Sequence, residues 1–316
     1  MAPLTWRRHA WSNRLQTVLL LFALLGISGL AGALLFGVQG MWIALLASLL
    51  ALLIEPAAGA RLTLTLYRAR PIAEYQAPEL CAVARQLADI AGLPSRPVLH
   101  YAPTPLVNAF AVGQRKRSAV ALTDGLLRAL SMREITGVLA HEIAHIAHGD
   151  LRVMNLADYI SRLTSLFAFV GQILLLLSLP LILTGSAEID LFALLLLVVS
   201  PHLALLAQLG LSRVREFDAD LEAVRITGDP AGLASALAKI ERVSRSWRSW
   251  LLPGWGNPEP SWLRTHPATE ERISRLLSLA DAGPRHLPRQ EIPPLAPGIW
   301  RTRRGAPRWY PGGYWY

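Results

Sequence analysis

Residues 138–150 read VLAHEIAHIAHGD, and this stretch predicts a helix in the middle of the chain. We expect the helix to begin at Ser131, because Glu134 follows three residues later in the capping-box pattern. We expect the helix to end at Gly149, since glycine is common just beyond the last turn of a helix. The helix is apolar over most of its length, so the polar side chains near its end need an explanation.

Two histidines and a glutamate in this stretch have the spacing of a metal site. His141 and His145 are one turn apart on the same helix face, so both imidazoles can reach a single ion. Glu142 lies one residue further round, where it can hold a water molecule without binding the metal. A lone histidine is usually an ordinary solvated or hydrogen-bonded side chain, but the His-Glu-x-x-His spacing matches zinc geometry and no packing rule requires it. A third ligand is still needed to complete a catalytic site.

A second helical stretch, LSRVREFDADLEAVRITG at 211–228, offers the missing ligand. Glu216 and Asp220 are four residues apart on one face, so one can bind the metal while the other hydrogen-bonds a ligating histidine. A surface helix with Glu–Arg pairs is the competing interpretation and accounts for Arg213 and Arg215. It does not explain why the pattern follows directly on an apolar segment.

Four uncharged apolar segments predict an integral membrane protein. The chain is 53% hydrophobic, and segments of about 20 apolar residues can cross a hydrocarbon core as helices. The first segment is too long for a signal peptide, so we expect it to be retained. Two segments are separated only by a short turn containing glycine, and the other two flank a short acidic loop. These predicted spans are residues 15–37, 38–54, 164–184 and 191–211.

Arginine distribution predicts the orientation of the spans. Arginines flank the N-terminus and the long segments 61–160 and 212–316, whereas the two short loops contain neither Lys nor Arg. By the positive-inside rule, both termini and both long segments face the cytoplasm. The formal charge of +9 then follows from topology and contact with anionic lipid, and no nucleic-acid partner is required. The single cysteine, Cys81, cannot form an internal disulfide, in agreement with a reducing compartment.

The soluble segments predict helices beside a small β-sheet. Residues 74–91 have apolar positions at helical spacing. Three β-type runs follow at 97–102, 108–113 and 118–123, and the basic sequence QRKR separates the last two as a hairpin turn would. The fold class predicted is therefore mainly α with a small β-sheet, attached to four transmembrane helices.

Four motifs together resemble the HtpX family of membrane-integrated zinc endopeptidases, which share a core with the multispan CAAX prenyl protease. The motifs are NAFA at 108–111, HEIAH at 141–145, SRVREFDAD at 212–220 and THPATEERI at 265–273. Four motifs in the family's order are more specific than His-Glu-x-x-His alone. The resemblance covers residues 60–280 and implies a zincin-type protease domain on the cytoplasmic side.

The resemblance also implies the roles of individual residues. His141, His145 and Glu216 match the ligands of one zinc ion, Glu142 matches the general base, and Asp220 matches an acid that supports a ligand. An extended substrate is expected beside an edge strand, either around NAFA or around SAVAL at 118–122. The residues expected to contact it are Asn108, Ala109, Phe110 and Ala111.

His266 in the last motif has two interpretations. It matches a family histidine near the cleft, where a protonated imidazole would stabilise the oxyanion of the reaction. The same sequence also reads as a helix start, because Thr265 can cap, Pro267 suits the first turn, and Glu270 and Glu271 follow. Both interpretations stay open, since one does not exclude the other.

The predicted organisation alternates membrane and protease segments. It comprises a transmembrane hairpin (1–60), a first protease segment (61–163), a second hairpin (164–211), a second protease segment (212–282) and a tail rich in Pro, Arg and aromatic residues (283–316).

The predicted function is a zinc endopeptidase of the bacterial inner membrane. It would act in quality control of misfolded or damaged membrane proteins, with membrane lipids and polypeptide substrates as partners. Two alternatives stay open, namely a processing protease for lipidated or specific membrane peptides, and a non-catalytic adaptor with a structural metal. The oligomeric state does not follow from the sequence.

Overall fold

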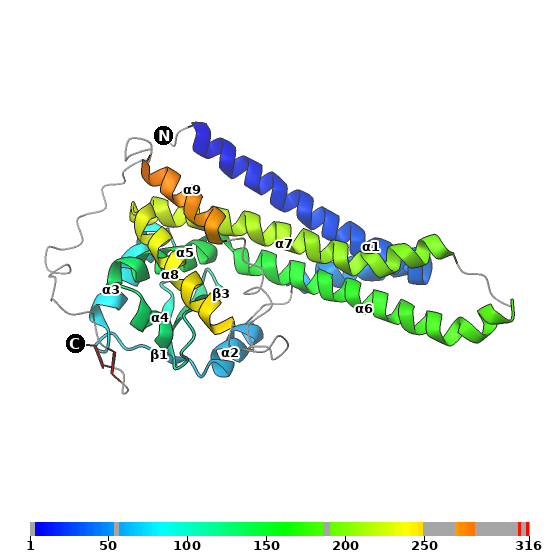
Figure 1. Cartoon of the computed structure of the whole chain (residues 1–316), viewed down its shortest axis with the longest axis horizontal. Coiled ribbons are helices and arrows are strands. Elements are labelled where there is room, and N and C mark those ends of the chain that lie inside the picture. Colours follow the sequence, from blue (N-terminus) through cyan, green and yellow to red (C-terminus); the bar gives the residue numbers. More distant parts are fainter. Residues whose placement is uncertain are drawn as a thin grey trace.

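The computed structural model describes residues 4–53, 57–185, 190–248 and 269–281, together with 309–310 and 314–315. A long helical bundle extends from one side of a smaller part that contains helices and a sheet (Figure 1). The helices described are α1 (Leu4–Leu53), α2 (Ala57–Leu66), α3 (Pro78–Ile90), α4 (Asp124–Ala129), α5 (Met132–His148), α6 (Asp150–Leu183), α7 (Leu191–Thr227), α8 (Pro230–Arg248) and α9 (Thr269–Asp281). The strands are β1 (Arg70–Pro71), β2 (Val98–Ala102), β3 (Ala109–Gln114) and β4 (Arg117–Thr123), with a separate pair β5 (Trp309–Tyr310) and β6 (Tyr314–Trp315).

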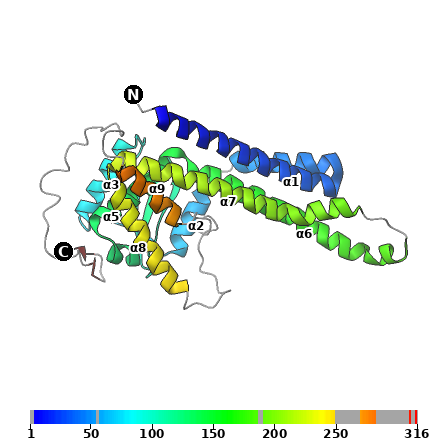
Figure 2. The same ribbon diagram turned by 45° about the horizontal axis from the view of Figure 1, so that its top comes forward.

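Helices α1, α6 and α7 pack against one another and form the bundle (Figures 1 and 2). Small side chains such as Ala31, Ala157 and Ala204 are buried between the helices, whereas large apolar side chains such as Phe22 and Leu176 are exposed on the outside. This pattern is the reverse of that in a soluble domain and is expected for lipid-facing helices. Three stretches are long and apolar enough to cross a membrane, namely Leu15–Leu50, Asp150–Pro180 and Leu191–Thr227.

Helix α1 is interrupted within its apolar length. Phe36 and Gly37 have non-helical backbone angles, and Gly37 adopts a positive φ of 64°. The chain turns back there, because Gly32 and Gly40 lie so close that a Cβ on either would collide with the carbonyl of the other. The predicted tight hairpin is therefore observed, and the prediction that each of its arms is a separate span stays a prediction.

Two helices continue from the bundle into the soluble part. The predicted segment boundaries at 163 and 211 fall inside α6 and α7, and the boundary at 60 falls inside α2, which the sequence analysis did not identify. Each helix is continuous, because neither boundary carries a break in helical periodicity. The C-terminal end of α7, which lies in the soluble part, therefore has a fixed position relative to the bundle.

The soluble part is built on a four-stranded sheet with the order β1-β2-β4-β3. Strands β3 and β4 form the predicted hairpin, and Arg115 and Lys116 make the turn. Strand β4 is paired on both sides, with β2 in parallel and with β3 antiparallel, so SAVAL cannot offer a free edge. Within the described sheet, β3 is the edge strand next to α5.

Helix α5 lies at the centre of the apolar core. The side chains of Ile135, Leu139 and Ile143 are fully buried against the sheet and the neighbouring helices. The predicted capping box is confirmed, because Ser131 accepts from the Glu134 amide while the Glu134 carboxylate accepts from the Ser131 amide. Gly149 ends the helix with a φ of 73°, and α6 begins at the next residue. This sharp reversal turns the start of α6 back toward the end of α5.

Candidate metal centre and cleft

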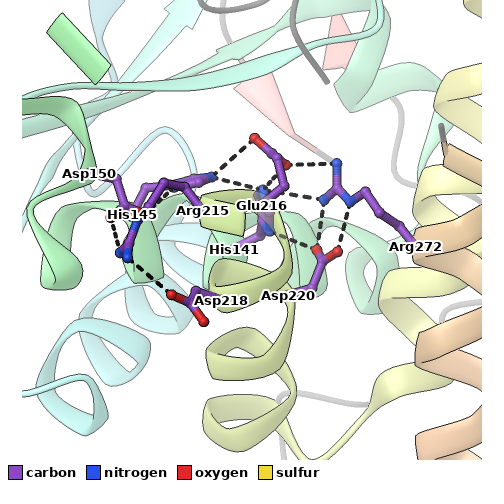
Figure 3. Close-up of polar contacts among 8 residues, drawn as sticks. All are labelled: His141, His145, Asp150, Arg215, Glu216, Asp218, Asp220 and Arg272. Carbon is purple, nitrogen blue, oxygen red and sulfur yellow. Dashed lines mark hydrogen bonds and ion pairs between the residues drawn. The ribbon is translucent and has the colours of Figure 1, made fainter. Parts of the chain in front are cut away.

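Three side chains from α5 and α7 converge at one point (Figure 3). The Nε2 atoms of His141 and His145 are 3.1 Å apart, because one helical turn aligns the two residues. Glu216 comes from α7, with Oε2 3.3 Å from His141 Nε2 and Oε1 3.6 Å from His145 Nε2. The exposed fractions of His141 and Glu216 are 6% and 5%, so the cluster is well protected from solvent.

This spacing suits a single metal ion. Ligand atoms about 2.0–2.1 Å from a tetrahedral zinc ion lie about 3.3 Å from one another. The observed separations of 3.1, 3.3 and 3.6 Å bracket that value. Within the described residues the cluster has three ligands, two imidazoles and one carboxylate, which is the donor set of a catalytic site with an open fourth position.

On one side, His141 is held by an aspartate and an arginine from later helices. His141 Nδ1 lies 3.0 Å from Asp220 Oδ1, one turn beyond Glu216 on α7. Arg272 on α9 forms two bonds of 2.7 Å to the Asp220 carboxylate and also lies 2.8 Å from Glu216 Oε2. Arg272 therefore fixes the ligand Glu216 and the partner of the ligand His141 at once (Figure 3).

On the other side, His145 is held by the start of α6. His145 Nδ1 lies 2.7 Å from Asp150 Oδ2, and the reversal at Gly149 brings that aspartate into position. Arg215, the residue before Glu216, donates from Nε to Asp150 Oδ1 at 2.7 Å and from Nη1 to Asp218 at 3.0 Å. With Nδ1–H donating to the aspartate, the Nε2 lone pair of His145 is left facing the metal position.

The centre contains more buried negative than positive charge. Carboxylates outnumber guanidinium groups four to two among the buried side chains here, which are Glu142, Asp150, Glu216, Asp220, Arg215 and Arg272. Burial by itself would lower the pKa of His141, but hydrogen bonds with Asp220 and Glu216 outweigh it and raise the pKa to about 10. Buried charges are stable only when they are paired, so the site favours a divalent cation.

A cleft opens beside the cluster. Glu142, His145 and Glu216 line it together with Ala109 from the edge strand β3. Side chains alternate along this strand, so Phe110 points to the other face and packs against Tyr67 with ring centroids 4.7 Å apart. Glu142 thus shares one cleft with two of the candidate metal ligands and with the strand, an arrangement suited to hydrolysis of an extended peptide.

The structure brings together most of the residues singled out in the sequence. His141, Glu142, His145, Glu216 and Asp220 form one centre, and Ala109 lies at its cleft. Asn108 precedes β3, and its main chain is bonded to Thr123. Ala111 is buried in the core of the sheet, and His266 lies outside the described residues.

Three polar residues of the centre were missed in the sequence analysis. Asp150 and Arg215 become relevant only when α6 and α7 pack together, although an acid directly after the helix-ending glycine is a detectable signal. Arg272 carries a clearer signal, because it lies on the same face of α9 as the buried Leu276, one turn away. A charged residue on the apolar face of an amphipathic helix usually has a buried partner.

Comparison with known proteins places the chain in a family. Residues 74–280 match the family model described as "Peptidase family M48". The chain belongs to peptidase family M48. A "Protease HtpX homolog" of Pelotomaculum thermopropionicum is 34% identical over 294 residues, which are 85% of this chain and 99% of the relative. A second protein with this description, from Acaryochloris marina, is 39% identical over 240 residues, which are 69% and 78% of the two chains.

A crystal structure of S. mikatae Ste24p also resembles this M48 chain, with a TM-score of 0.47 and 18% identity, over 85% of this chain and 66% of that one. The family and the apolar helices identify the protein as a membrane-associated, HtpX-like metalloprotease. The His141, His145 and Glu216 cluster is its candidate metal site.

Proposed function

We propose that this M48 protein is a zinc-dependent endopeptidase that cleaves misfolded or damaged membrane proteins near the cytoplasmic face of the bacterial inner membrane. The observation that carries the proposal is the convergence of His141, His145 and Glu216 at tetrahedral spacing beside a cleft that Glu142 lines. Two imidazoles and one carboxylate favour zinc over the harder divalent ions.

When bound, zinc would act as a Lewis acid toward the peptide carbonyl and lower the pKa of water in the cleft. Glu142 takes a proton from that water and later passes it to the leaving amine. Asp150 accepts a hydrogen bond from Nδ1 of His145, and Asp220 lies 3.0 Å from Nδ1 of His141, so the Nε2 atoms of both histidines are left for the metal. The two arginines hold those aspartates in place.

Strand β3 provides the surface for the substrate. As an edge strand beside the cleft, it can pair with an extended polypeptide through main-chain groups, which tolerates many sequences. Asn108 to Ala111 would therefore contribute mainly backbone, and Phe110 would support the strand from behind through Tyr67. His266 is proposed to stabilise the oxyanion during attack.

The place of cleavage follows from α7. Glu216 lies five residues beyond the predicted end of the apolar segment at 211, about 8 Å along a helix. The metal would thus lie close to the membrane surface. Arginines beside the long segments favour the cytoplasmic side, and the two arms of α1 with α6 and α7 would make four spans.

The test is cleavage of casein, an unfolded model protein, by the full chain purified in detergent with zinc. Glu142→Gln is expected to retain the metal while cleavage falls by about 10²–10⁴-fold, because it removes only the proton acceptor. A chelator should abolish activity, and added zinc should restore it. A chain that holds zinc but cleaves neither soluble nor membrane substrates better than Glu142→Gln would support the adaptor alternative.

A further inference from the structure

Helix α2 presents an apolar face that nothing in the described structure covers. Leu62 and Leu66 are one turn apart and expose 61% and 59% of their surface. The opposite face, with Leu64 and the following Tyr67, packs against Phe110 in β3. The helix therefore has apolar side chains on both faces, and only one of these faces meets protein among the described residues.

Three arginines lie on this helix or within four residues of its end. Arg61, Arg68 and Arg70 are exposed, and none pairs with a carboxylate among the residues that the structure describes. Arg68 also adopts a φ of 49°, a left-handed conformation at the end of the helix that glycine usually fills.

The position of α2 indicates what covers the face. Only three residues separate the helix from the apolar α1, a gap that spans at most about 15 Å. Both views place α2 on the side of the sheet from which α6 and α7 extend (Figures 1 and 2). Helix α2 thus lies on the side of the soluble part that would face the membrane if the bundle crosses it.

We propose that α2 lies in the membrane interface, with Leu62 and Leu66 among the first acyl carbons and Arg61, Arg68 and Arg70 on the phosphates of anionic lipids. Apolar side chains flanked by arginine are the typical features of a helix that binds in this plane. Because Tyr67 and Phe110 connect α2 to β3, the bilayer would also hold the edge strand and turn the cleft toward membrane substrates.

The test measures the depth of α2 in vesicles. A Cys81→Ala background leaves no native thiol, so Leu62→Cys or Leu66→Cys can carry a single fluorescent NBD label. Glu79→Cys is the control, because it is exposed on α3, on the side away from the bundle (Figures 1 and 2). The full chain is reconstituted in phosphatidylcholine and phosphatidylglycerol, with bromine near the start of the acyl chains.

Labels at 62 and 66 are expected to be quenched by the brominated lipid at least about twofold more than the label at 79, and less by aqueous acrylamide. Equal quenching at the three positions would overturn the proposal. Protection from both quenchers at 62 and 66 would also overturn it, because it would mean that protein covers the helix. The readout needs no proteolysis, so it stands apart from failure of the proposed function.

The headgroup contacts need a separate comparison. In vesicles with phosphatidylglycerol, emission from the label at 62 should shift to the blue relative to phosphatidylcholine alone. Changing Arg61, Arg68 and Arg70 to Gln should remove that difference, whereas changing three arginines that are paired with carboxylates should preserve it. That control triple is Arg85, Arg96 and Arg128. The arginine contacts would be contradicted if phosphatidylglycerol did not change the emission of the parent protein. They would also be contradicted if the emission shift were lost equally in both triple variants.

Discussion

His145 and His141 are each supported by an aspartate and an arginine, but the two supports come from different parts of the chain. The support of His145 begins locally, because Asp150 follows five residues later, and its arginine, Arg215, comes from α7 beside the ligand Glu216. The support of His141 is remote, since Arg272 comes from α9, 131 positions away. The local support needs only the association of α5, α6 and α7, whereas the remote one needs α9 to be docked as well.

The largest effect is expected where both supports meet, at Glu216. Glu216→Gln should lower metal affinity by more than about 100-fold, which exceeds the loss typical of changing a residue that only hydrogen-bonds a ligand. Cleavage should fall to background. Metal retained after dialysis is the measurement. Glu222→Gln is the control. Glu222 lies on the same helix, two turns beyond Arg215, and this variant should keep the metal. Equal metal content in both variants would show that Glu216 is not a ligand.

Arg272→Met tests the remote support directly. Removing one partner from a buried ion network is expected to destabilise the protein by about 3–5 kcal/mol, because Asp220 and Glu216 keep buried charge. Denaturant unfolding in detergent measures the loss. Arg275→Met, one turn further along α9, removes a cation–π contact with Phe217 and should cost at most about 1 kcal/mol. Similar losses in the two variants would mean that α9 docking, and not the ion network, is what matters.

The two aspartates allow the supports to be ranked. Asp220→Asn and Asp150→Asn should each lower metal affinity by about 10–100-fold, as for other partners of ligating histidines. Asp220→Asn is expected to lower metal affinity more than Asp150→Asn. After Asp220→Asn the carboxylate that Arg272 still pairs with is the ligand Glu216, whereas after Asp150→Asn Arg215 still pairs with Asp218. Competition with a zinc chelator measures both affinities. A greater loss in Asp150→Asn would reverse the ranking of the two supports.

The smallest effect concerns the beginning of α5, far from either support. Burial opposes ionisation of Glu134, but bonds from Lys239, Ser235 and Ser131 outweigh it and lower its pKa to about 2. A lowered pKa stabilises the fold above the unfolded value near 4.5, and this contribution is lost as pH falls toward 2. Glu134→Gln should therefore lose about 1–2 kcal/mol at neutral pH and less at pH 3. Unfolding curves at both pH values measure this, and Glu74→Gln, an exposed control, should show no such difference.

Much of the helical organisation could be predicted from the sequence, because it depends on local signals. The capping box at Ser131, the stop at Gly149 and the turn between β3 and β4 are properties of a few adjacent residues, and all three are confirmed. The choice of β3 over β4 as edge strand was left open, since strand order depends on pairing between distant segments. Helix α2 was missed because its short apolar run has no clear start or stop signal.

The sequence by itself determined that His141 and His145 share a face, that Glu142 lies beside them, and that apolar helices carry this site to a membrane. Helical periodicity is sufficient for each of these conclusions. Only the tertiary structure decided that Asp150 and Arg215 hold one histidine while Asp220 and Arg272 hold the other. Contacts between elements up to 131 residues apart depend on how helices pack around the core, and side-chain spacing along one helix contains no information about that packing.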